Sequence, residues 1–308
     1  MDLYRMAGAG AAAGLRPFYP LGAIVKGFVP APVRRMRGRF DPGAEVLGRL
    51  GSLEVRLARS REEVKAAQQL RYHVFYEEMS ARPSRVQKLT RRDKDGFDRY
   101  CDHLLVIDRT RGGPLGDQIV GTYRLMGEEG AALAGGFYTA QEFDIAPLLA
   151  RHRGKRFLEL GRSCVLKDYR GKRTVELLWQ GIYAYVRQNR IDVLFGCASL
   201  SGTDPATLAL PLSFLKTSAA APAEWRVRAQ PRRGIAIDET IICSDPRRAL
   251  AALPPLLKGY LRIGGYIGED AVVDHQFGTT DVLVVVPVVN INPRYIEYYG
   301  DTSGRFAA

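Results

Sequence analysis

Hydrophobic residues follow two different periods near the start of the patterned part of the chain. Residues Leu53–Ala58 alternate apolar and polar side chains, a period of two that predicts a β-strand. Ser60 and Glu63 then have the spacing of a capping box and predict the start of a helix. One face of that helix carries apolar residues at helical spacing, namely Val64, Ala67, Leu70 and Val74.

Short apolar runs predict further strands. His103–Asp108 and Ile119–Met126 flank a turn with Gly and Pro at 112–116, a pattern typical of an antiparallel strand pair. Phe143–Leu149 predicts a short helix or turn. The segment before the first of these runs is polar and strongly basic, which predicts a loop with Arg82, Arg85, Lys88, Arg91 and Arg92.

A strand, a helix and a second strand follow one another between residues 157 and 198. The strands are Phe157–Leu166 and Val193–Ala198, and the helix between them has an apolar stripe at Val175, Leu178, Ile182 and Val186. This order is βαβ-like and favours a right-handed parallel crossover or a neighbouring pair. Residues 205–262 predict helix in pieces, and Asp281–Val289 predicts a closing strand.

Residues 1–50 differ in composition from the rest. They hold eight basic and three acidic residues, and repeated prolines interrupt any helix, so we expect a basic, Pro- and Gly-rich flexible tail before a single domain over 51–300. The apolar segment Leu21–Val29 precedes four arginines within 34–39, a pairing that suits an anionic bilayer surface. A solvated leader without a partner is the alternative.

Charge and cysteine content narrow the class of protein. The 308 residues are 46% apolar with a formal charge of +12, which excludes disorder for most of the chain and favours an acidic partner such as nucleic acid, anionic lipid or an acidic carrier protein. Four cysteines lie far apart, with neither zinc-ligand nor disulfide spacing, so we expect no metal and a reducing cytoplasm. No apolar run reaches the ~18 residues of a membrane span.

The most informative stretch joins a carboxylate on a strand to a basic loop before a helix. Glu159-Leu-Gly-Arg162 is followed by Arg170-Gly171-Lys172-Arg173, an arrangement that can hold a general base and a phosphate-bearing group. Here the sequence resembles the GCN5-related N-acetyltransferase (GNAT) superfamily, whose loop is Arg-Gly-x-Gly-x-Gly. Arg173 and Val175 stand where the next two glycines would be, which favours a single phosphopantetheine phosphate over the pyrophosphate of coenzyme A.

A narrower resemblance covers roughly residues 55 to 300. Several motifs have the order and spacing of the acyl-homoserine-lactone synthases, namely Arg71–Phe75, Asp95–Asp98, His103–Val106, Gly121–Leu125 and Glu159–Arg162. Those synthases usually have serine at the position of Gly161. Three motifs are similar to the related ornithine N-alpha-acyltransferases, also called haemolysin-like, namely Cys101–Val106, Glu159–Val165 and Asp274–Asp281. The resemblance implies an α/β (α+β) GNAT-like acyltransferase fold, with a mixed, mostly antiparallel sheet flanked by helices.

This resemblance also implies an activity. It is the transfer of a 3-hydroxy fatty acyl chain from acyl carrier protein to the α-amine of L-ornithine, which gives lyso-ornithine lipid. Glu159 would be the base that deprotonates the acceptor ammonium, with Arg162 as its catalytic partner. Arg124 and Arg162 would hold the acceptor carboxylate, Asp95 and Asp98 would meet its second ammonium, and Arg71 would complete the substrate-binding set.

The donor side is expected at the strand end and the basic loop. The backbone around Cys164 and Val165 would polarise the thioester carbonyl. Arg170, Gly171, Lys172 and Arg173 would bind acyl carrier protein and its phosphopantetheine, with help from the basic residues of 85–92. The carrier brings the phosphopantetheine, so no other cofactor is expected, and the enzyme would be cytoplasmic and peripheral on the inner face of the membrane.

Other interpretations stay open at this point. The pair Glu159 and Arg162 also suits a structural ion pair beside a strand. Asp95 and Asp98 also suit a turn. Arg71 also suits a solvated helix face. Cys101 and His103 would be a thiol nucleophile pair. For the whole chain the alternatives are an acyl-homoserine-lactone synthase, a basic nucleic-acid-binding protein without a recognised motif, and a pore-forming haemolysin.

Overall fold

The computed structural model describes residues 40–41, 43–237, 245–292 and 295. A compact unit begins at Phe40, and the apolar segment Leu21–Val29 with its arginines lies outside the described residues. Cys243 also lies outside them, and the other three cysteines are free thiols. Within the described ranges no helix is both long and apolar enough to cross a bilayer.

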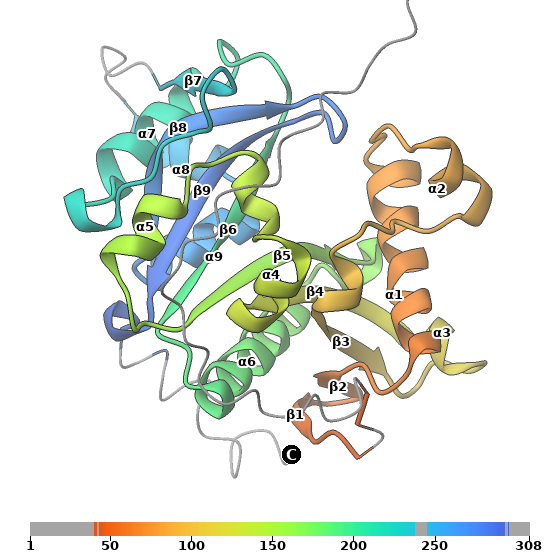
Figure 1. The fold of residues 1–308 in the computed structure, drawn as a ribbon. Coiled ribbons are helices and arrows are strands. Elements are labelled where there is room, and N and C mark those ends of the chain that lie inside the picture. Colours follow the sequence, from red (N-terminus) through yellow and green to blue (C-terminus); the bar gives the residue numbers. More distant parts are fainter. Residues whose placement is uncertain (1–39, 42, 238–244, 293–294, 296–308) are drawn as a thin grey trace, which may run out of the picture. The chain divides into compact units, whose positions relative to one another are not determined.

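Nine strands form one sheet in the order β1-β2-β3-β4-β5-β6-β9-β8-β7 (Figure 1). Every neighbouring pair is antiparallel except β5 and β6, which run parallel. The strands are β1 (Val46–Leu50), β2 (Leu53–Leu57), β3 (Asp102–Asp108), β4 (Ile119–Gly127), β5 (Phe157–Val165), β6 (Val193–Ser201), β7 (Gly234–Ala236), β8 (Tyr266–Asp274) and β9 (Thr279–Pro287). The mixed, mostly antiparallel sheet expected from the resemblance is therefore confirmed.

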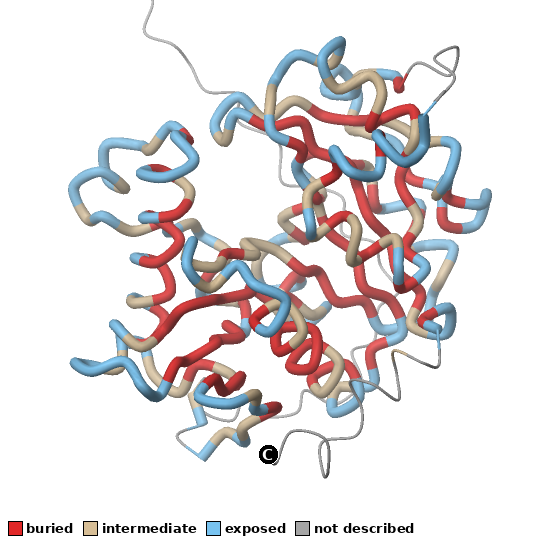
Figure 2. The backbone as a smooth tube through the Cα atoms, turned by 180° about the vertical axis from the view of Figure 1, so that it is seen from behind, coloured by how far each residue is buried: buried red, intermediate tan, exposed pale blue. Residues whose placement is uncertain are grey.

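The two long helices pack on opposite faces of this sheet. Alternate residues of β3 separate into two clusters, because Leu104 and Val106 pack with helix α6 (Lys172–Asn189) while Leu105 and Ile107 pack with helix α1 (Arg61–Tyr72). Such alternation follows from the period of two along a strand. Figure 2 shows the buried residues following the strands.

Shorter elements complete the chain. The remaining α-helices are α2 (Arg85–Thr90), α3 (Leu115–Gln118), α4 (Glu128–Ala134), α5 (Ala146–Arg151), α7 (Ala209–Ala219), α8 (Pro246–Ala252) and α9 (Pro255–Arg262). A π-helical turn, His73–Glu78, extends α1, and the 3-10 turn η3 (Tyr138–Gln141) lies before α5. Other 3-10 turns are Asp98–Tyr100, Lys167–Tyr169, Ala223–Trp225 and Val288–Asn290.

Several predicted elements are confirmed and others need correction. The capping residue Ser60, the β3–β4 pair, the β5-α6-β6 unit and β9 appear where the pattern predicts them. The tail boundary at residue 50 is wrong, because Val46–Leu50 pairs with β2 and buries Leu47. The predicted basic loop of 82–92 contains helix α2, and Ser84 and Gln87 form a capping box at the N-terminus of that helix. Strand β8 was not predicted, because Gly, Glu and Asp interrupt its alternation.

An extra residue interrupts β5 next to β4. Thr122 pairs with Cys164 and Arg124 pairs with Gly161, so two steps along β4 match three along β5. This β-bulge places Arg162 in the left-handed region, at φ 53°. The bulge lies in the part of β5 that lines the cavity, and both Glu159 and Arg162 border that cavity.

Strands β5 and β6 part after a short parallel pairing. They pair only over Phe157–Glu159 and Val193–Phe195, although β6 continues to Ser201 against β9. At Gly196, where the parting begins, a Cβ atom would lie 2.2 Å from the carbonyl oxygen of Leu160. The two backbones thus approach too closely there for any side chain.

Replacement of Gly196 by alanine tests this close approach. We expect Gly196→Ala to lower the free energy of unfolding by ~1–3 kcal/mol, because the added methyl forces the strands apart. Chemical denaturation measures the change. Gly112→Ala is the control, since a Cβ there meets nothing within 4 Å, and it should shift stability by less than ~0.5 kcal/mol. Equal effects of both substitutions would contradict the close approach.

Candidate active site

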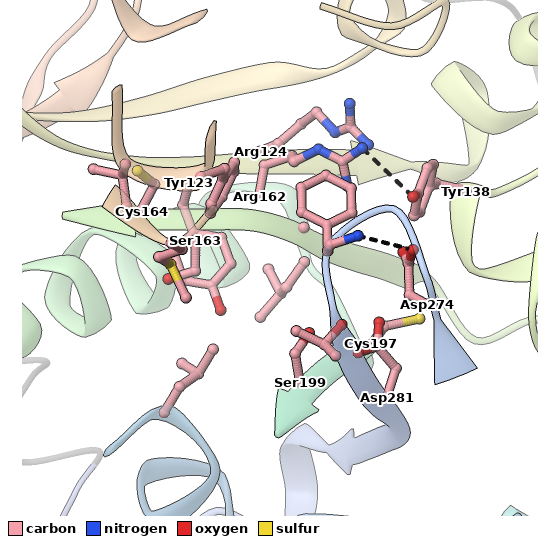
Figure 3. A pocket seen from close by; sticks show the side chains of 18 of the residues that line it. Tyr123, Arg124, Tyr138, Arg162, Ser163, Cys164, Cys197, Ser199, Asp274 and Asp281 are labelled. Atoms are coloured by element: carbon pink, nitrogen blue, oxygen red, sulfur yellow. Dashed lines mark hydrogen bonds between the residues drawn. The ribbon is translucent and has the colours of Figure 1, made fainter. Parts of the chain in front are cut away.

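A cavity of about 400 Å³ opens where β5 and β6 part (Figure 3). Its wall is formed by β4, β5, β6, the β8–β9 hairpin, η3 and the π-helical turn. Five of the residues expected in the site line it directly, namely Arg124, Glu159, Arg162, Cys164 and Val165, and Arg170 lies at its edge as the sixth. Arg71, Asp95, Asp98, Gly171, Lys172 and Arg173 do not line it.

Behind the wall, Arg71 holds a loop that carries three aspartates. Its side chain is fully buried, its Nε lies 2.9 Å from Asp93 Oδ2, and its Nη2 donates to Asp98 Oδ2 at 2.9 Å. The same nitrogen also donates to the carbonyl oxygen of Asp93. Gln68 Nε2 donates to Asp98 at 3.0 Å. Arg71 is therefore a structural centre of the site, and the alternative of a solvated helix residue is wrong.

The two arginines that line the cavity are joined to the same loop. Arg124 Nη1 donates to Asp95 Oδ2 at 2.6 Å and to Asp98 Oδ1 at 3.3 Å. Arg162 Nε donates to Asp93 Oδ2 at 3.2 Å, and its Nη2 donates to Asp95 Oδ2 at 3.4 Å. Three guanidinium groups thus share three carboxylates, which fixes Arg124 and Arg162 in place.

The carboxylates of this network are already neutralised. Burial by itself would raise the pKa of Asp98, but Arg71 and Arg124 hold it far below the usual range. The pKa of Asp95 is lowered in the same way by Arg124 and Arg162 against the effect of burial. Asp95 also accepts from the backbone N–H groups of Phe97 and Asp98. Asp95 and Asp98 therefore belong to an ion-pair network and a turn, so the structure gives no support to the expectation that they meet a substrate ammonium.

Glu159 is held by the turn η3. Its Oε2 accepts from the backbone N–H of Tyr138 at 3.0 Å, and its Oε1 accepts from that of Thr139 at 2.6 Å. The residue is 4% exposed and borders the cavity. A salt bridge between Glu159 and Arg162 is not among the contacts of the described residues, and the partners of the carboxylate are backbone N–H groups of η3.

Aromatic rings cover Arg162. Its guanidinium carbon lies 4.6 Å from the ring centre of Tyr138 and 5.0 Å from that of Phe277. Such stacking is favourable and restricts the side chain further. Figure 3 shows Tyr138 beside Arg162 at one end of the cavity. The apolar part of the wall lies elsewhere and consists of Val74, Phe75, Met79, Ala81, Val165 and Leu256.

The basic loop begins at the cavity and leads into α6. Arg170 donates from Nε to the carbonyl oxygen of Val165 at 3.0 Å and pairs with Glu78. Gly171 is the N-cap of α6, and Lys172 and Arg173 follow as exposed residues in its first turn. Positive side chains and the free N–H groups of a helix start therefore lie next to each other at the cavity edge.

A second group of carboxylates includes two residues of the cavity wall, Asp274 and Asp281. Oxygens of Glu142, Asp274 and Asp281 are all within 4.8 Å of one another, a geometry that can hold a cation. Burial, followed by Asp281 and Asp274, raises the pKa of Glu142 to about 7. Burial likewise raises the pKa of Asp281 to about 6. These carboxylates differ from those of the aspartate loop, because among the described residues no arginine forms a salt bridge with them.

Neither the position nor the pKa of Cys101 supports a thiol nucleophile. Cys101 and His103 do not line the cavity, and Cys101 Sγ donates to the carbonyl oxygen of Phe97. Burial raises the pKa of Cys101 to about 12 and lowers that of His103 to about 4. A thiolate at neutral pH is therefore strongly disfavoured at this position.

The sequence interpretation overlooked several residues of the site. Asp93 and Tyr138 lie in segments without hydrophobic periodicity, so no pattern pointed to them. Asp274 and Asp281 belong to a motif that is similar to the ornithine N-alpha-acyltransferases, but no role was predicted for either residue. A signal existed for Asp281, because it follows the alternation of Leu283 and Val285, which are buried on the same face of β9. A carboxylate in line with buried apolar residues indicates a special environment.

Comparison with known proteins places the chain among acyltransferases. Residues 70–180 match the family described as acetyltransferase (GNAT) domain. The chain is 52% identical over 271 residues to the L-ornithine N(alpha)-acyltransferase of Rhizobium meliloti (strain 1021), covering 87% of this chain and 90% of that protein. It is 54% identical over 261 residues to the protein of the same name from Agrobacterium fabrum, covering 84% and 89%. A solved N-acyl amino acid synthase from uncultured soil microbes is 12% identical, with a TM-score of 0.43 over 80% of this chain and 93% of that one.

Loss of Arg71 tests the structural role of the ion-pair network. We expect Arg71→Met to lower the free energy of unfolding by ~3–5 kcal/mol, because it leaves buried carboxylates without their partner. Denaturant titration measures the loss. Lys65→Met is the matched control on the same helix, since its ion pair with Glu62 is exposed and such pairs contribute under ~1 kcal/mol. A similar small loss for Arg71→Met would contradict the role.

Proposed function

The chain belongs to the family of L-ornithine N(alpha)-acyltransferases, and from that premise we propose that it transfers a 3-hydroxy fatty acyl chain from acyl carrier protein to the α-amine of L-ornithine. The observation that carries the proposal is the cavity between the parted strands β5 and β6, which brings guanidinium groups, a buried glutamate and an apolar wall together. Lyso-ornithine lipid would be the product. An amide bond forms, and the thioester bond breaks.

Glu159 is our candidate for the base. The α-ammonium of the acceptor must lose a proton before its nitrogen can attack the thioester carbonyl. Each carboxylate oxygen of Glu159 accepts one backbone N–H and keeps a further lone pair for a proton, directly or through a water molecule. The neutral amine then attacks, and the collapsing tetrahedral intermediate expels the phosphopantetheine sulfur, which takes up a proton.

Arg124 and Arg162 are our candidates for binding the acceptor carboxylate. Each guanidinium has five N–H donors, and the aspartate loop uses only some of them. Their planar geometry suits a carboxylate, and the network behind them removes the conformational freedom that would otherwise be lost on binding. Arg71, Asp95 and Asp98 act in this proposal as positioning residues.

The donor is proposed to bind at the basic loop. Acyl carrier proteins are acidic, so Arg170, Lys172 and Arg173 offer complementary charge at the cavity edge. The phosphopantetheine phosphate would lie near the start of α6, and the thioester would reach Cys164 and Val165. The acyl chain would follow the apolar wall. Because the carrier supplies the phosphopantetheine, the proposal needs no resident cofactor.

A membrane contact completes the proposal. The product is an amphiphile with one acyl chain, and release at a bilayer surface avoids its passage through water. The sequence before Phe40 contains an apolar segment followed by arginines, a combination that favours binding to an anionic membrane leaflet. The enzyme would then work in the cytoplasm as a peripheral protein.

Replacement of Glu159 tests the base. We expect Glu159→Gln to lower kcat for ornithine by ~10²–10⁴ at pH 7, measured as acyl transfer from acyl carrier protein by mass spectrometry. The loss should shrink at pH 9, where a larger share of the acceptor amine is already neutral. A structural role through η3 alone would give the same loss at both pH values, and that result would rule out the base. Glu128→Gln, an exposed carboxylate of α4, serves as the control.

Charge reversal tests the donor site. We expect Arg170→Glu with Lys172→Glu and Arg173→Glu to raise KM for the acyl carrier protein at least tenfold and to flatten its salt dependence, because the attraction to an acidic carrier is lost. The same acyl chain on coenzyme A should be the poorer donor for the unaltered enzyme. If both donors give equal kcat/KM in the unaltered enzyme, the carrier is not the specific donor. S-adenosylmethionine offered in place of ornithine tests the lactone synthase alternative in the same assay.

A further inference from the structure

The acidic group of Glu142, Asp274 and Asp281 has features that a merely structural cluster lacks. Glu142 and Asp281 are 4% and 6% exposed. Glu142 Oε2 and Asp281 Oδ1 each lack a hydrogen-bond partner among the described residues. An unsatisfied buried carboxylate oxygen costs free energy. Nothing in the described fold requires these oxygens to stay unsatisfied, so a hydrogen-bond donor on a bound ligand is the simplest explanation for their presence.

The position of the group indicates which donor it would meet. Asp274 and Asp281 line the same cavity as Arg124 and Arg162, and they come from the β8–β9 hairpin, whereas the arginines come from β4 and β5 (Figure 3). The cavity therefore carries positive side chains on one part of its wall and negative side chains on another. A ligand that matches both parts has an anionic group and a cationic group separated by a short chain.

We propose that Glu142, Asp274 and Asp281 select a diamino acid acceptor by binding its side-chain ammonium. The proposal rests on the proposed function and adds to it the part of the site that distinguishes a basic amino acid from an apolar one. Asp281 donates no hydrogen bond when ionised and offers its free oxygen to the ammonium. Glu142 does not line the cavity, and it acts as a positioning residue next to Asp281 and Asp274.

The spacing of the oxygens suits an ammonium. An ammonium that donates hydrogen bonds of about 2.8 Å in tetrahedral directions holds its acceptors about 4.6 Å apart. The three carboxylates have oxygens within 4.8 Å of one another. Asp274 is fixed in this arrangement, because its Oδ1 accepts from the backbone N–H groups of Gln276 at 2.7 Å and Phe277 at 3.1 Å.

The charges around the group support the same assignment. Asp281 and Asp274 raise the pKa of Glu142 and Arg233 lowers it by a smaller amount, while Asp274 raises the pKa of Asp281 and Arg162 lowers it. Mutual repulsion and burial together raise the pKa of Glu142 and of Asp281. A cation placed between them would relieve both effects.

The test compares two acceptors that differ only in the terminal amine. L-ornithine and L-norvaline have the same carbon chain, and norvaline lacks the second amine. We expect the unaltered full-length enzyme to favour ornithine by about 10²-fold or more in kcat/KM, because norvaline leaves the carboxylates unpaired. Asp281→Asn and Glu142→Gln should each reduce this preference by about 10- to 100-fold. The kcat/KM for norvaline should stay within about threefold.

Three outcomes would overturn the assignment. An equal loss with both acceptors would make the carboxylates structural or catalytic rather than selective. An unchanged preference would place the ammonium elsewhere. Loss of activity with both acceptors after EDTA treatment, restored by Mg²⁺ or Ca²⁺, would assign the carboxylates to a metal ion instead. Glu128→Gln again serves as the control and should leave both acceptors unaffected.

A binding measurement separates this inference from the proposed function. Without any acyl donor, saturating L-ornithine should raise the midpoint of thermal unfolding of the unaltered enzyme more than L-norvaline does. Asp281→Asn should abolish the difference. If this binding result holds while acyl transfer to amino acids is absent, the proposed reaction is wrong and the ammonium site stands. If acyl transfer to ornithine occurs but ornithine and norvaline bind equally, the inference is wrong and the proposed function stands. Each variant is also unfolded without ligand, where a midpoint equal to or above that of the unaltered enzyme shows that it folds.

Discussion

Shared ion pairing between buried arginines and aspartates is the interaction on which the site depends. The members are Arg71, Arg124, Arg162, Asp93, Asp95 and Asp98. They come from α1, β4, β5 and the loop before β3, so one set of contacts joins that loop to the three elements. A buried ion pair contributes little net stability compared with an apolar replacement, but it specifies geometry. Here that geometry is the direction of two guanidinium groups into the cavity.

The two charged parts of the cavity wall differ in how their charge is balanced. Arg124 and Arg162 form salt bridges with aspartates, whereas Glu142 and Asp281 form none within the described part of the chain. An anionic ligand therefore meets rigid guanidinium groups with compensated charge, and its binding depends on hydrogen bonds to their remaining N–H groups. A cationic group meets uncompensated charge, and its binding depends on electrostatic attraction that the low dielectric of the interior strengthens. Selectivity among amino acids would follow mainly from the second part of the wall.

The sequence predicted the sheet and the family more completely than the site. Strands with continuous apolar runs, such as β3, β4 and β9, were predicted, and β8 was missed where polar residues interrupt the pattern. The order and spacing of the motifs predicted Glu159, Arg124 and Arg162 as site residues, and all three line one cavity in the structure. Asp95 and Asp98 were predicted to bind the substrate ammonium, because the sequence shows where carboxylates occur but not which arginines they pair with. The partner Asp93 and the cluster at Glu142 depend on contacts between distant segments, which one sequence does not contain.

The bulge in β5 limits how the gene can change in length. One residue is added between the pairings of Gly161 and Cys164 with β4, and Arg162 takes a left-handed conformation there. Deletion of one codon between Gly161 and Cys164 would remove the added residue and restore regular pairing, with Gly161 and Cys164 still opposite Arg124 and Thr122. A substitution there alters one side chain, but such a deletion removes the backbone conformation that directs the Arg162 side chain. Changes of length in surface loops are tolerated more readily than a deletion in this segment.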